Sequence, residues 1–400
     1  MVDSVGNSKI TGSNLSDDTI MARSHAAEDP YGAVVLPVYR SVVYRFTGTE
    51  SNGPHGRPWK YGREDNPTVA VFERVMASLE GGEAALAFNS GMAALATILL
   101  GLVEPGTTVI LWAHTYGTTL HLLRLMAGKI GYKLELAIEP NEVVEKASCV
   151  KGRKLVFVES ISNPFLYMVD ITELAKVCKE SNCILVVDNT FASPILLKPS
   201  KLGAHLVLES VTKYIAGHND VLGGVVVGDQ KTIDGVLWDW RRSLGSVMQA
   251  DAAYLAMRGL KTLRVRLEKQ SRSAQQIAEF LADHPKVSEV YYLGLPSHPS
   301  HNIARRLLIH NFYGGVISFR VKGDKEAVQK LFKRLKIITP SPSLGGVESL
   351  ISYPIASSHL YLPEDIRRKL GITEDLVRLS VGLEDVDDLI EDLDNALAGI

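Results

Sequence analysis

Cysteine is scarce in this sequence, which limits the covalent links and metal sites available to it. The 400 residues include only three cysteines, Cys149, Cys178 and Cys183. Three thiols cannot all pair, and their spacing is not that of metal ligands, so we expect neither a disulfide framework nor a zinc–cysteine site. His298 and His301 have no cysteine or carboxylate cluster beside them, so no metal is expected there either. Free thiols are typical of a reducing compartment.

Long apolar runs and an excess of one charge are also missing. No run approaches the roughly 18 apolar residues of a membrane span, and the polar start, residues 1–18, lacks the regions of a signal peptide. With 43 Lys and Arg against 45 Asp and Glu the formal net charge is −2, so neither nucleic acid nor an acidic membrane is an expected partner. We therefore expect a cytoplasmic protein.

The length and the hydrophobic pattern predict two domains and an arm, because 400 residues exceed what one compact core usually carries. Short apolar strands alternate with helical segments from about residue 84 to 228, which predicts a mostly parallel, covered α/β sheet. No Gly-x-Gly-x-x-Gly turn follows a strand, which argues against a nicotinamide-binding domain. A long helix after residue 260 leads to a smaller α/β domain. The expected division is an arm over 1–65, a large domain over 66–260 and a C-terminal domain over 261–400.

One lysine, Lys213, lies in a polar turn between two short apolar runs that are typical of buried strands, 206–208 and 225–227. Ser210 and Thr212 place hydroxyl groups just before it, and small residues follow it. A lysine desolvated in such a pocket becomes a nucleophile toward a carbonyl group. The alternative is a solvated turn lysine.

Other polar side chains also follow predicted strands. Ser90 and Gly91 open an Ala- and Leu-rich helix, whose first N–H groups favour an anion. Tyr116 and Asp188 come after strands predicted at 108–112 and 184–187; the alternatives are a core tyrosine and a simple Asx turn. Ligands of α/β sheets bind at the carboxyl ends of the strands, so we expect these groups to gather at one edge.

Two arginines are candidate anion ligands. Arg378 lies on a predicted strand and could hold a carboxylate through a bidentate fork, with a salt bridge to Glu384 or Asp385 as the alternative. Arg63 belongs to a cluster rich in glycine, proline and aromatics at 51–63. The alternative to an anion-binding role for Arg63 is an ion pair with the acidic residues that follow it.

A resemblance strengthens these hypotheses. The stretch Ser210-Val-Thr-Lys213-Tyr-Ile-Ala-Gly-His-Asn-Asp220, followed by Gly223-Gly224, resembles the lysine signature of the Cys/Met-metabolism family of pyridoxal-phosphate enzymes. Further matches cover most of the chain from about Gly32 to Glu384. The resemblance implies pyridoxal 5′-phosphate (PLP) as cofactor and fold type I of the PLP-dependent transferases, which is aspartate aminotransferase-like. That fold has a mostly parallel seven-stranded sheet in a large domain and a smaller C-terminal α/β domain.

The resemblance also implies roles for individual residues. Lys213 would hold the cofactor and carry protons, Tyr116 would stack on its ring, and Asp188 would pair with the ring nitrogen. The remaining cofactor-binding residues would be Ser90, Gly91, Met92, Asn163, Ser210, Thr212 and, from the neighbouring subunit, Tyr61 and Arg63. Arg378 with Ser343 would hold the substrate carboxylate, and Asn163, Tyr61 and Glu348 would contact the substrate, Glu348 at a distal amino group.

The implied reaction is trans-sulfuration at Cγ of homoserine-derived amino acids. Glu348 favours the γ-synthase and γ-lyase branches over β-lyase, and Thr118 stands where methionine γ-lyases usually carry cysteine. We expect a cystathionine γ-synthase, with cystathionine γ-lyase as the alternative and then O-acylhomoserine sulfhydrylase or methionine γ-lyase. Retention of so many functional residues argues against a non-catalytic binding protein.

The resemblance further implies at least a dimer, because Tyr61 and Arg63 act across the interface, and usually a homotetramer of two active dimers.

The sequence also departs from the family pattern at several positions, and the sequence alone gives no physical reason for these differences. The departures are Gly62, Glu64-Asp65, Ile161, Lys198 and Glu209.

Overall fold

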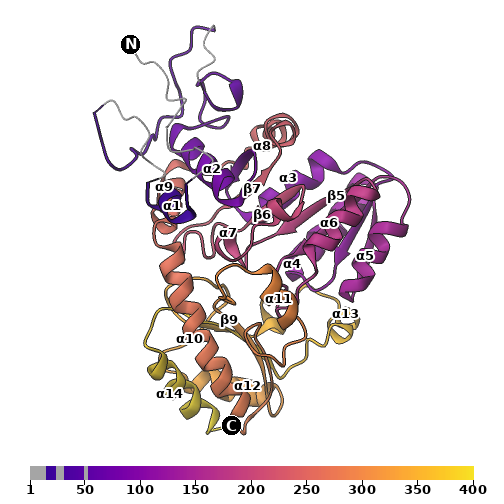
Figure 1. The fold of residues 1–400 in the computed structure, drawn as a ribbon, viewed down its shortest axis with the longest axis vertical. Helices are drawn as coiled ribbons and strands as arrows, with labels where there is room; N and C mark the ends of the chain where they lie inside the picture. Colours follow the sequence, from indigo (N-terminus) through magenta and orange to yellow (C-terminus); the bar gives the residue numbers. More distant parts are fainter. Residues whose placement is uncertain (1–14, 24–30, 49–52) are drawn as a thin grey trace.

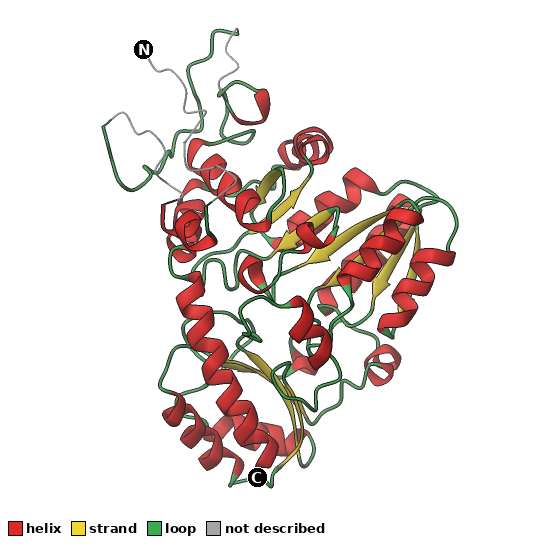
Figure 2. Cartoon of the chain, in the orientation of Figure 1, coloured by secondary structure: helices red, strands yellow, loops and turns green. Residues whose placement is uncertain are grey.

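The structure is a computed structural model that describes residues 15–23, 31–48 and 53–400. Two β-sheets lie in different halves of the molecule, the larger beside the N-terminal segments and the smaller near the C-terminus (Figures 1 and 2). Most of the polar start, residues 1–14, lies outside the described residues, as do residues 51 and 52 of the Gly/Pro-rich cluster. No helix in the described ranges is long and apolar enough to cross a membrane.

The larger sheet has seven strands in the order β1-β7-β6-β5-β4-β2-β3. All neighbours pair in parallel except β7, which is antiparallel to both β1 and β6. The predicted mostly parallel seven-stranded sheet is therefore confirmed. Its strands are β1 (Ala84–Phe88), β2 (Thr108–Trp112), β3 (Lys133–Ala137), β4 (Lys154–Glu159), β5 (Cys183–Asp188), β6 (Leu206–Glu209) and β7 (Gly224–Gly228).

Helices cover both faces of this sheet, which is why its strands are apolar without alternation. Along β2, Val109 and Leu111 belong to one buried cluster while Ile110 and Trp112 belong to another on the opposite face. The helical elements are α2 (Pro67–Glu80), α3 (Gly91–Leu102), α4 (Gly117–Ile130), α5 (Pro140–Cys149), α6 (Ile171–Glu180), α7 (Ser193–Leu196), η2 (Pro199–Leu202), η3 (Thr232–Leu237), α8 (Trp238–Leu244) and α9 (Ala250–Leu260).

The helices that lead to the site begin at capping residues. Asn66 accepts hydrogen bonds from the N–H groups of Thr68 and Val69 at 2.9 and 3.3 Å, and Pro67 occupies the first turn of α2. The Ser90 hydroxyl accepts from Ala93 N at 3.1 Å at the start of α3.

The smaller sheet has the order β10-β11-β12-β9-β8, and the long helix α10 lies against β8 and β9. Its strands are β8 (Val287–Tyr291), β9 (Val316–Val321), β10 (Thr339–Pro340), β11 (Leu350–Ser352) and β12 (Leu376–Ser380). The accompanying helical elements are α10 (Leu263–Asp283), α11 (His301–Leu307), α12 (Lys325–Arg334), η4 (Pro354–Ala356), α13 (Glu364–Lys369) and α14 (Val386–Leu397). The domain limits after residues 65 and 260 stay predictions.

The N-terminal arm contains two short helical elements. It contains the helix α1 (Asp17–Arg23) and the short 3-10 turn η1 (Pro54–Gly56). Acidic residues in the first turn of α1 and Arg23 in its last complement the helix dipole, and Met21 is buried. Seven residues are too few for a helical period to show in the sequence.

A buried charged cluster attaches the arm to the large sheet. Arg241 on α8 donates to Glu73 at 2.7 Å and to Asp65 at 3.1 Å. His55 of η1 contacts Asp234 through Nδ1 at 2.5 Å. Burial alone would lower the pKa of His55, but the contact with Asp234 and the Glu73 carboxylate 3.5 Å from Nε2 raise that pKa to about 9. The acidic departure at Asp65 is therefore a buried counter-ion of Arg241.

Replacing Arg241 should destabilise the fold strongly. Arg241→Met would leave the carboxylates of Glu73 and Asp65 buried without their guanidinium, and we expect a loss of about 3–5 kcal/mol in the free energy of unfolding. Urea denaturation measures it. The control Arg272→Ala breaks an exposed pair with Glu268 and should change stability by less than about 0.5 kcal/mol. Equal effects of the two changes would contradict the role assigned to the cluster.

Candidate active site

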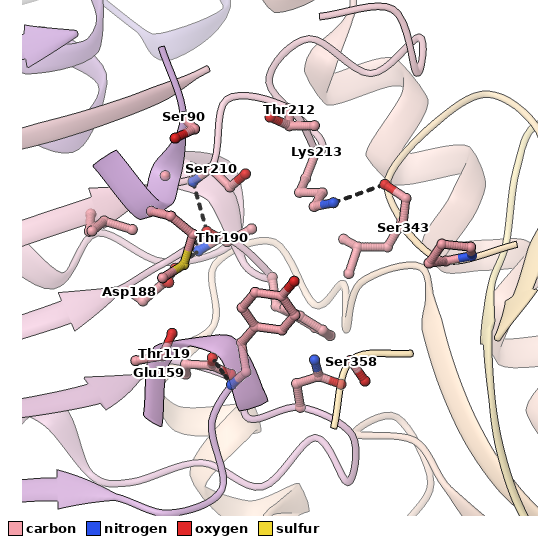
Figure 3. A pocket seen from close by; sticks show the side chains of 18 of the residues that line it. Ser90, Thr119, Glu159, Asp188, Thr190, Ser210, Thr212, Lys213, Ser343 and Ser358 are labelled. Carbon is pink, nitrogen blue, oxygen red and sulfur yellow. Dashed lines mark hydrogen bonds between the residues drawn. The ribbon is translucent and has the colours of Figure 1, made fainter. Parts of the chain in front are cut away.

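A cavity of about 560 Å³ opens where the carboxyl ends of β4, β5 and β6 meet residues of the C-terminal half. Figure 3 shows Asp188, Ser210 and Lys213 on one side of it and Ser343 on the other. Most of the predicted site residues line this cavity: Ser90, Gly91, Met92, Tyr116, Asn163, Asp188, Ser210, Thr212, Lys213, Ser343 and Arg378.

Three predicted site residues lie outside the cavity. Tyr61 is 40% exposed and Arg63 lies over its ring, 5.3 Å from the centroid. Arg63 donates to the carbonyl of Arg242 at 2.5 Å and has no ion pair with Glu64 or Asp65, so that alternative is not observed among the described residues. Glu348 is exposed and accepts a hydrogen bond from Asn219 at 2.7 Å. The roles of these three stay predictions.

Lys213 lies in the turn between β6 and β7, as predicted, and its side chain enters the cavity. Its Nζ donates to the Ser343 hydroxyl at 2.9 Å, so the turn lysine is not solvated (Figure 3). Burial and then the positive charge of Arg378 lower the pKa of Lys213 to about 8. A substantial fraction of this amine is therefore neutral near physiological pH and available as a nucleophile.

Arg378 lies on β12, buried at 4% exposure, and faces the cavity. It donates to Asn163 Oδ1 and to the carbonyl of Ser343, both at 3.0 Å, while its Nε has no partner in the described part of the chain. The expected alternative, a salt bridge to Glu384, is not observed, since that carboxylate binds Ser349. Burial lowers the pKa of Arg378 to about 10. A buried guanidinium without a counter-ion is suited to an incoming carboxylate.

Two carboxyl groups lie side by side at the ends of β4 and β5, where Glu159 pairs in register with Asp188. Thr190 donates its N–H and hydroxyl to Asp188 at 3.0 and 2.5 Å, so Asp188 forms an Asx turn and also lines the cavity. Glu159 accepts from the N–H of Tyr116 at 2.6 Å. Burial raises the pKa of Asp188 to about 6, and burial with the charge of Asp188 raises that of Glu159 to about 8. A cationic N–H bound to Asp188 would keep that group ionised.

The start of α3 forms a close-packed anion cradle. A Cβ on Gly224 would lie 2.5 Å from the Ser90 carbonyl oxygen, and a Cβ on Gly91 would lie 3.3 Å from the side-chain Cβ of Ser210. The absence of these side chains allows the turn to approach β6 and β7. The first N–H groups of a helix have no partner within it, so with the helix dipole they favour a phosphate beside Ser210 and Thr212.

Tyr116 precedes α4 and lines the cavity with 39% of its surface exposed, so it is not a core tyrosine. Near it lies a hydroxyl that the sequence did not indicate, Ser358, whose Oγ is 2.8 Å from Nδ1 of His359. The other ring nitrogen faces the Thr115 carbonyl at 3.2 Å and must donate to it. Burial, then Arg378, lower the pKa of His359 to about 3, so the ring is neutral and accepts the Ser358 proton. Ser358 therefore offers only acceptor lone pairs to the cavity.

Glu159 and Thr190 were also missing from the predicted site, although both line the cavity. Glu159 ends an apolar strand in the same way as Asp188, which is the signal that could have found it. Ser358 lies after the short 3-10 turn η4 and carries no such signal. Within the described residues, no group of three or more His, Cys, Asp or Glu could hold a metal ion.

Residues 18–398 match a family model described as Cys/Met metabolism PLP-dependent enzyme. The chain is 41% identical over 385 residues to a cystathionine beta-lyase of Coxiella burnetii, covering 95% of this chain and 97% of that protein. It is 40% identical over 370 residues to a cystathionine gamma-synthase of Mycobacterium bovis, covering 92% of each. A solved structure of cystathionine gamma-lyase from Lactobacillus plantarum complexed with L-serine superimposes with a TM-score of 0.90 at 33% identity, covering 96% of this chain and 99% of that one.

The pair of Glu159 and Asp188 generates a prediction about pH. A carboxyl group with a raised pKa stabilises the fold below its usual pKa near 4.5, and this contribution is lost as pH rises through about 8. Glu159→Gln keeps the acceptor for Tyr116 without the charge. We expect the unfolding free energy of the variant, relative to that of the wild type, to rise by about 1–3 kcal/mol between pH 6 and pH 9.

Urea denaturation at both pH values makes this comparison. The control Glu145→Gln, at an exposed position of α5, should show no such difference. A Glu159→Gln protein that loses as much stability as the wild type between pH 6 and 9 would exclude Glu159 as the titrating group.

Proposed function

The chain belongs to the Cys/Met-metabolism PLP-dependent enzymes, and we propose that it is a cytoplasmic cystathionine γ-synthase. In this reaction cysteine sulfur replaces the acyl or phosphoryl ester group of an activated homoserine at Cγ. The observation that carries the proposal is the juxtaposition of Lys213 and Arg378 across Ser343. An amine with a lowered pKa there faces a buried guanidinium that forms no ion pair among the described residues, an arrangement that fits an α-amino acid.

The residues of the cavity fit PLP, which when bound supplies an electron sink for the carbanion at Cα. The start of α3 with Ser210 and Thr212 would hold its phosphate, together with Tyr61 and Arg63 of the partner subunit. Asp188 would hold the ring N–H, oriented by Thr190 as observed in the chain. Tyr116 would cover one face of the ring. The chain therefore offers partners for the phosphate, the ring N–H and one ring face of the cofactor.

The chain's own residues would then orient the substrate and move its protons. Arg378 would bind the α-carboxylate, with Asn163 and the Ser343 carbonyl holding the guanidinium in place. The amine of Lys213 would remove the Cα proton and return protons to neighbouring carbons. Its hydrogen bond to the Ser343 hydroxyl would keep it aimed between these positions. Ser358 would accept a hydrogen bond from a donor on the substrate's distal part.

Cystathionine γ-lyase is the second candidate, since elimination needs the same residues and the Lactobacillus plantarum γ-lyase superimposes over 96% of this chain. Glu348 supports both γ activities, because it could bind a distal ammonium group. O-acylhomoserine sulfhydrylase and methionine γ-lyase rank lower, the latter because Thr118 lacks a thiol. The Coxiella burnetii relative makes β-lyase activity an outcome to be measured.

We also propose a homotetramer of two active dimers. Apolar residues of the arm support a covered interface, because Val34 and Val43 are 82% and 70% exposed in the single chain. Because Tyr61 and Arg63 of the partner subunit would complete the phosphate site, a monomer should bind PLP weakly.

Lys213→Ala should abolish the covalent attachment of PLP and lower activity about 10³-fold or more, because both the nucleophile and the proton carrier are lost. Mass spectrometry after borohydride reduction and a turnover assay measure the two effects. Lys151→Ala, an exposed control, should behave like the wild type. A Lys213→Ala protein with full activity would exclude the catalytic assignment.

Arg378→Lys should raise KM for the amino acid about tenfold or more, because a single ammonium cannot form the bidentate fork. The absorption spectrum of bound PLP without substrate should stay unchanged, which separates substrate binding from cofactor binding. An unchanged KM would show that the carboxylate binds elsewhere.

Product analysis distinguishes the candidate reactions. The purified enzyme is given cystathionine alone, and separately cysteine with the acetyl, succinyl and phosphate esters of homoserine. A γ-synthase should form cystathionine faster than 2-oxobutyrate in the second series. Rapid 2-oxobutyrate from cystathionine with little synthesis identifies a γ-lyase, pyruvate and homocysteine identify a β-lyase, and absence of every product refutes the trans-sulfuration proposal.

A further inference from the structure

A second group of buried acids lies behind the cavity, where β5 and β6 end. It consists of Glu80 at the end of α2, Glu209 at the end of β6, and Asn189 directly after β5. Their exposed fractions are 0%, 1% and 0%. The Asn189 amide donates to Glu80 at 3.1 Å, to Glu209 at 3.2 Å and to the Leu197 carbonyl at 2.9 Å. None of these three residues lines the cavity.

The positions of the two acids favour a shared proton. One oxygen of Glu80 and one of Glu209 lie within 3.2 Å of the same Asn189 nitrogen, and two ionised carboxylates held so close together in the interior would repel each other. Burial raises the pKa of Glu80 to about 7 and that of Glu209 well above its usual value, and the facing carboxyl group adds to the shift of Glu209. The pair therefore retains a proton at neutral pH.

Charged neighbours complete the cluster. The ammonium of Lys198, which precedes η2, donates to Asp17 of α1 at 2.6 Å and lowers the pKa of Glu80. Asp188 on β5 adds negative charge beside Glu209. Lys198 and Glu209 are two of the residues that depart from the family pattern, and the structure shows that they belong to one cluster.

The cluster holds the same two strand ends whose other side carries cofactor ligands. Asn189 stands between Asp188 and Thr190, and Glu209 directly precedes Ser210. The N–H of Asn189 donates to the Leu208 carbonyl at 2.8 Å, and that of Ser210 donates to Thr190 at 2.8 Å. Figure 3 shows Asp188, Thr190 and Ser210 grouped together at the cavity wall. A change in the separation of Glu80, Asn189 and Glu209 must therefore move these ligands.

We propose that Glu80 and Glu209, joined by their shared proton and by Asn189, are positioning residues that clamp the ends of β5 and β6 and fix Asp188, Thr190 and Ser210 for PLP. The clamp opens when the shared proton is lost at alkaline pH, because two buried carboxylates then repel each other. Because the pKa values are raised, the shared proton stabilises the clamp fully below about pH 4.5. This stabilisation is lost as pH rises through about 7 and above.

The test is a titration of cofactor-free protein with PLP, followed by fluorescence, at pH 7 and pH 9. Glu209→Gln supplies a permanent N–H donor to Glu80 and an acceptor for Asn189 without a titrating proton. Glu80→Gln makes the same change from the other side. Glu209→Ala removes the contact. Glu180→Gln, at an exposed position of α6, is the control of matched charge change.

We expect the wild type and the control to lose about tenfold more PLP affinity between pH 7 and 9 than either buried glutamine variant. At pH 7 the glutamine variants should bind PLP within about threefold of the wild type, and Glu209→Ala about tenfold more weakly. The glutamine variants alone decide the matter if the alanine variant does not fold. Glutamine variants with the pH dependence of the wild type would overturn the proposal, as would wild-type affinity in Glu209→Ala. The PLP affinity at pH 7 and its change between pH 7 and 9 do not depend on which trans-sulfuration reaction the enzyme catalyses.

Discussion

The site depends on the buried, uncompensated charge of Arg378. A guanidinium in the interior is unfavourable unless it is hydrogen-bonded and paired, and among the described residues its partners are the amide oxygen of Asn163 and the carbonyl of Ser343, without a carboxylate. The same charge helps to lower the pKa of Lys213 and that of His359. An incoming carboxylate would satisfy the arginine and reduce its effect on both neighbours. Binding of a carboxylate at Arg378 would therefore raise the pKa of the Lys213 amine, so the two are coupled electrostatically.

Sheet topology explains why three acids lie close together at one edge of the larger sheet. Parallel strands β4, β5 and β6 end at the same edge, so Glu159, Asp188 and Glu209 follow one another along it. Successive side chains of a strand point to opposite faces. Asp188 therefore meets the cavity while Asn189 meets the acids behind it. The wall of the cavity thus has polar contacts on both sides, between Thr190 and Asp188 in front and between Asn189 and the two glutamates at the back.

The sequence predicted the structural features that depend on the local pattern of apolar and polar residues. Short apolar strands and the turn containing Lys213 were visible because the sheet is buried on both faces and its ends are polar. The helix α1, the Ser358–His359 contact and the Glu80–Glu209 pair were not predicted. Glu80 and Glu209 are far apart in the chain, and nothing in the residues around either one indicates the other. Partners of this kind are set by packing and not by local propensity. The family resemblance likewise marked Lys198 and Glu209 as unusual without showing that they lie in one cluster.

The central claim is that Lys213 and Arg378 frame an amino-acid site on PLP, completed by the partner subunit. A crystal structure of the PLP-loaded protein with a bound, unreactive amino acid tests it most directly. The account predicts the substrate carboxylate within hydrogen-bonding distance of the Arg378 guanidinium, the cofactor phosphate at the start of α3, and Arg63 of the partner subunit at that phosphate. A carboxylate bound away from Arg378, or a phosphate site made by one chain alone, would contradict it.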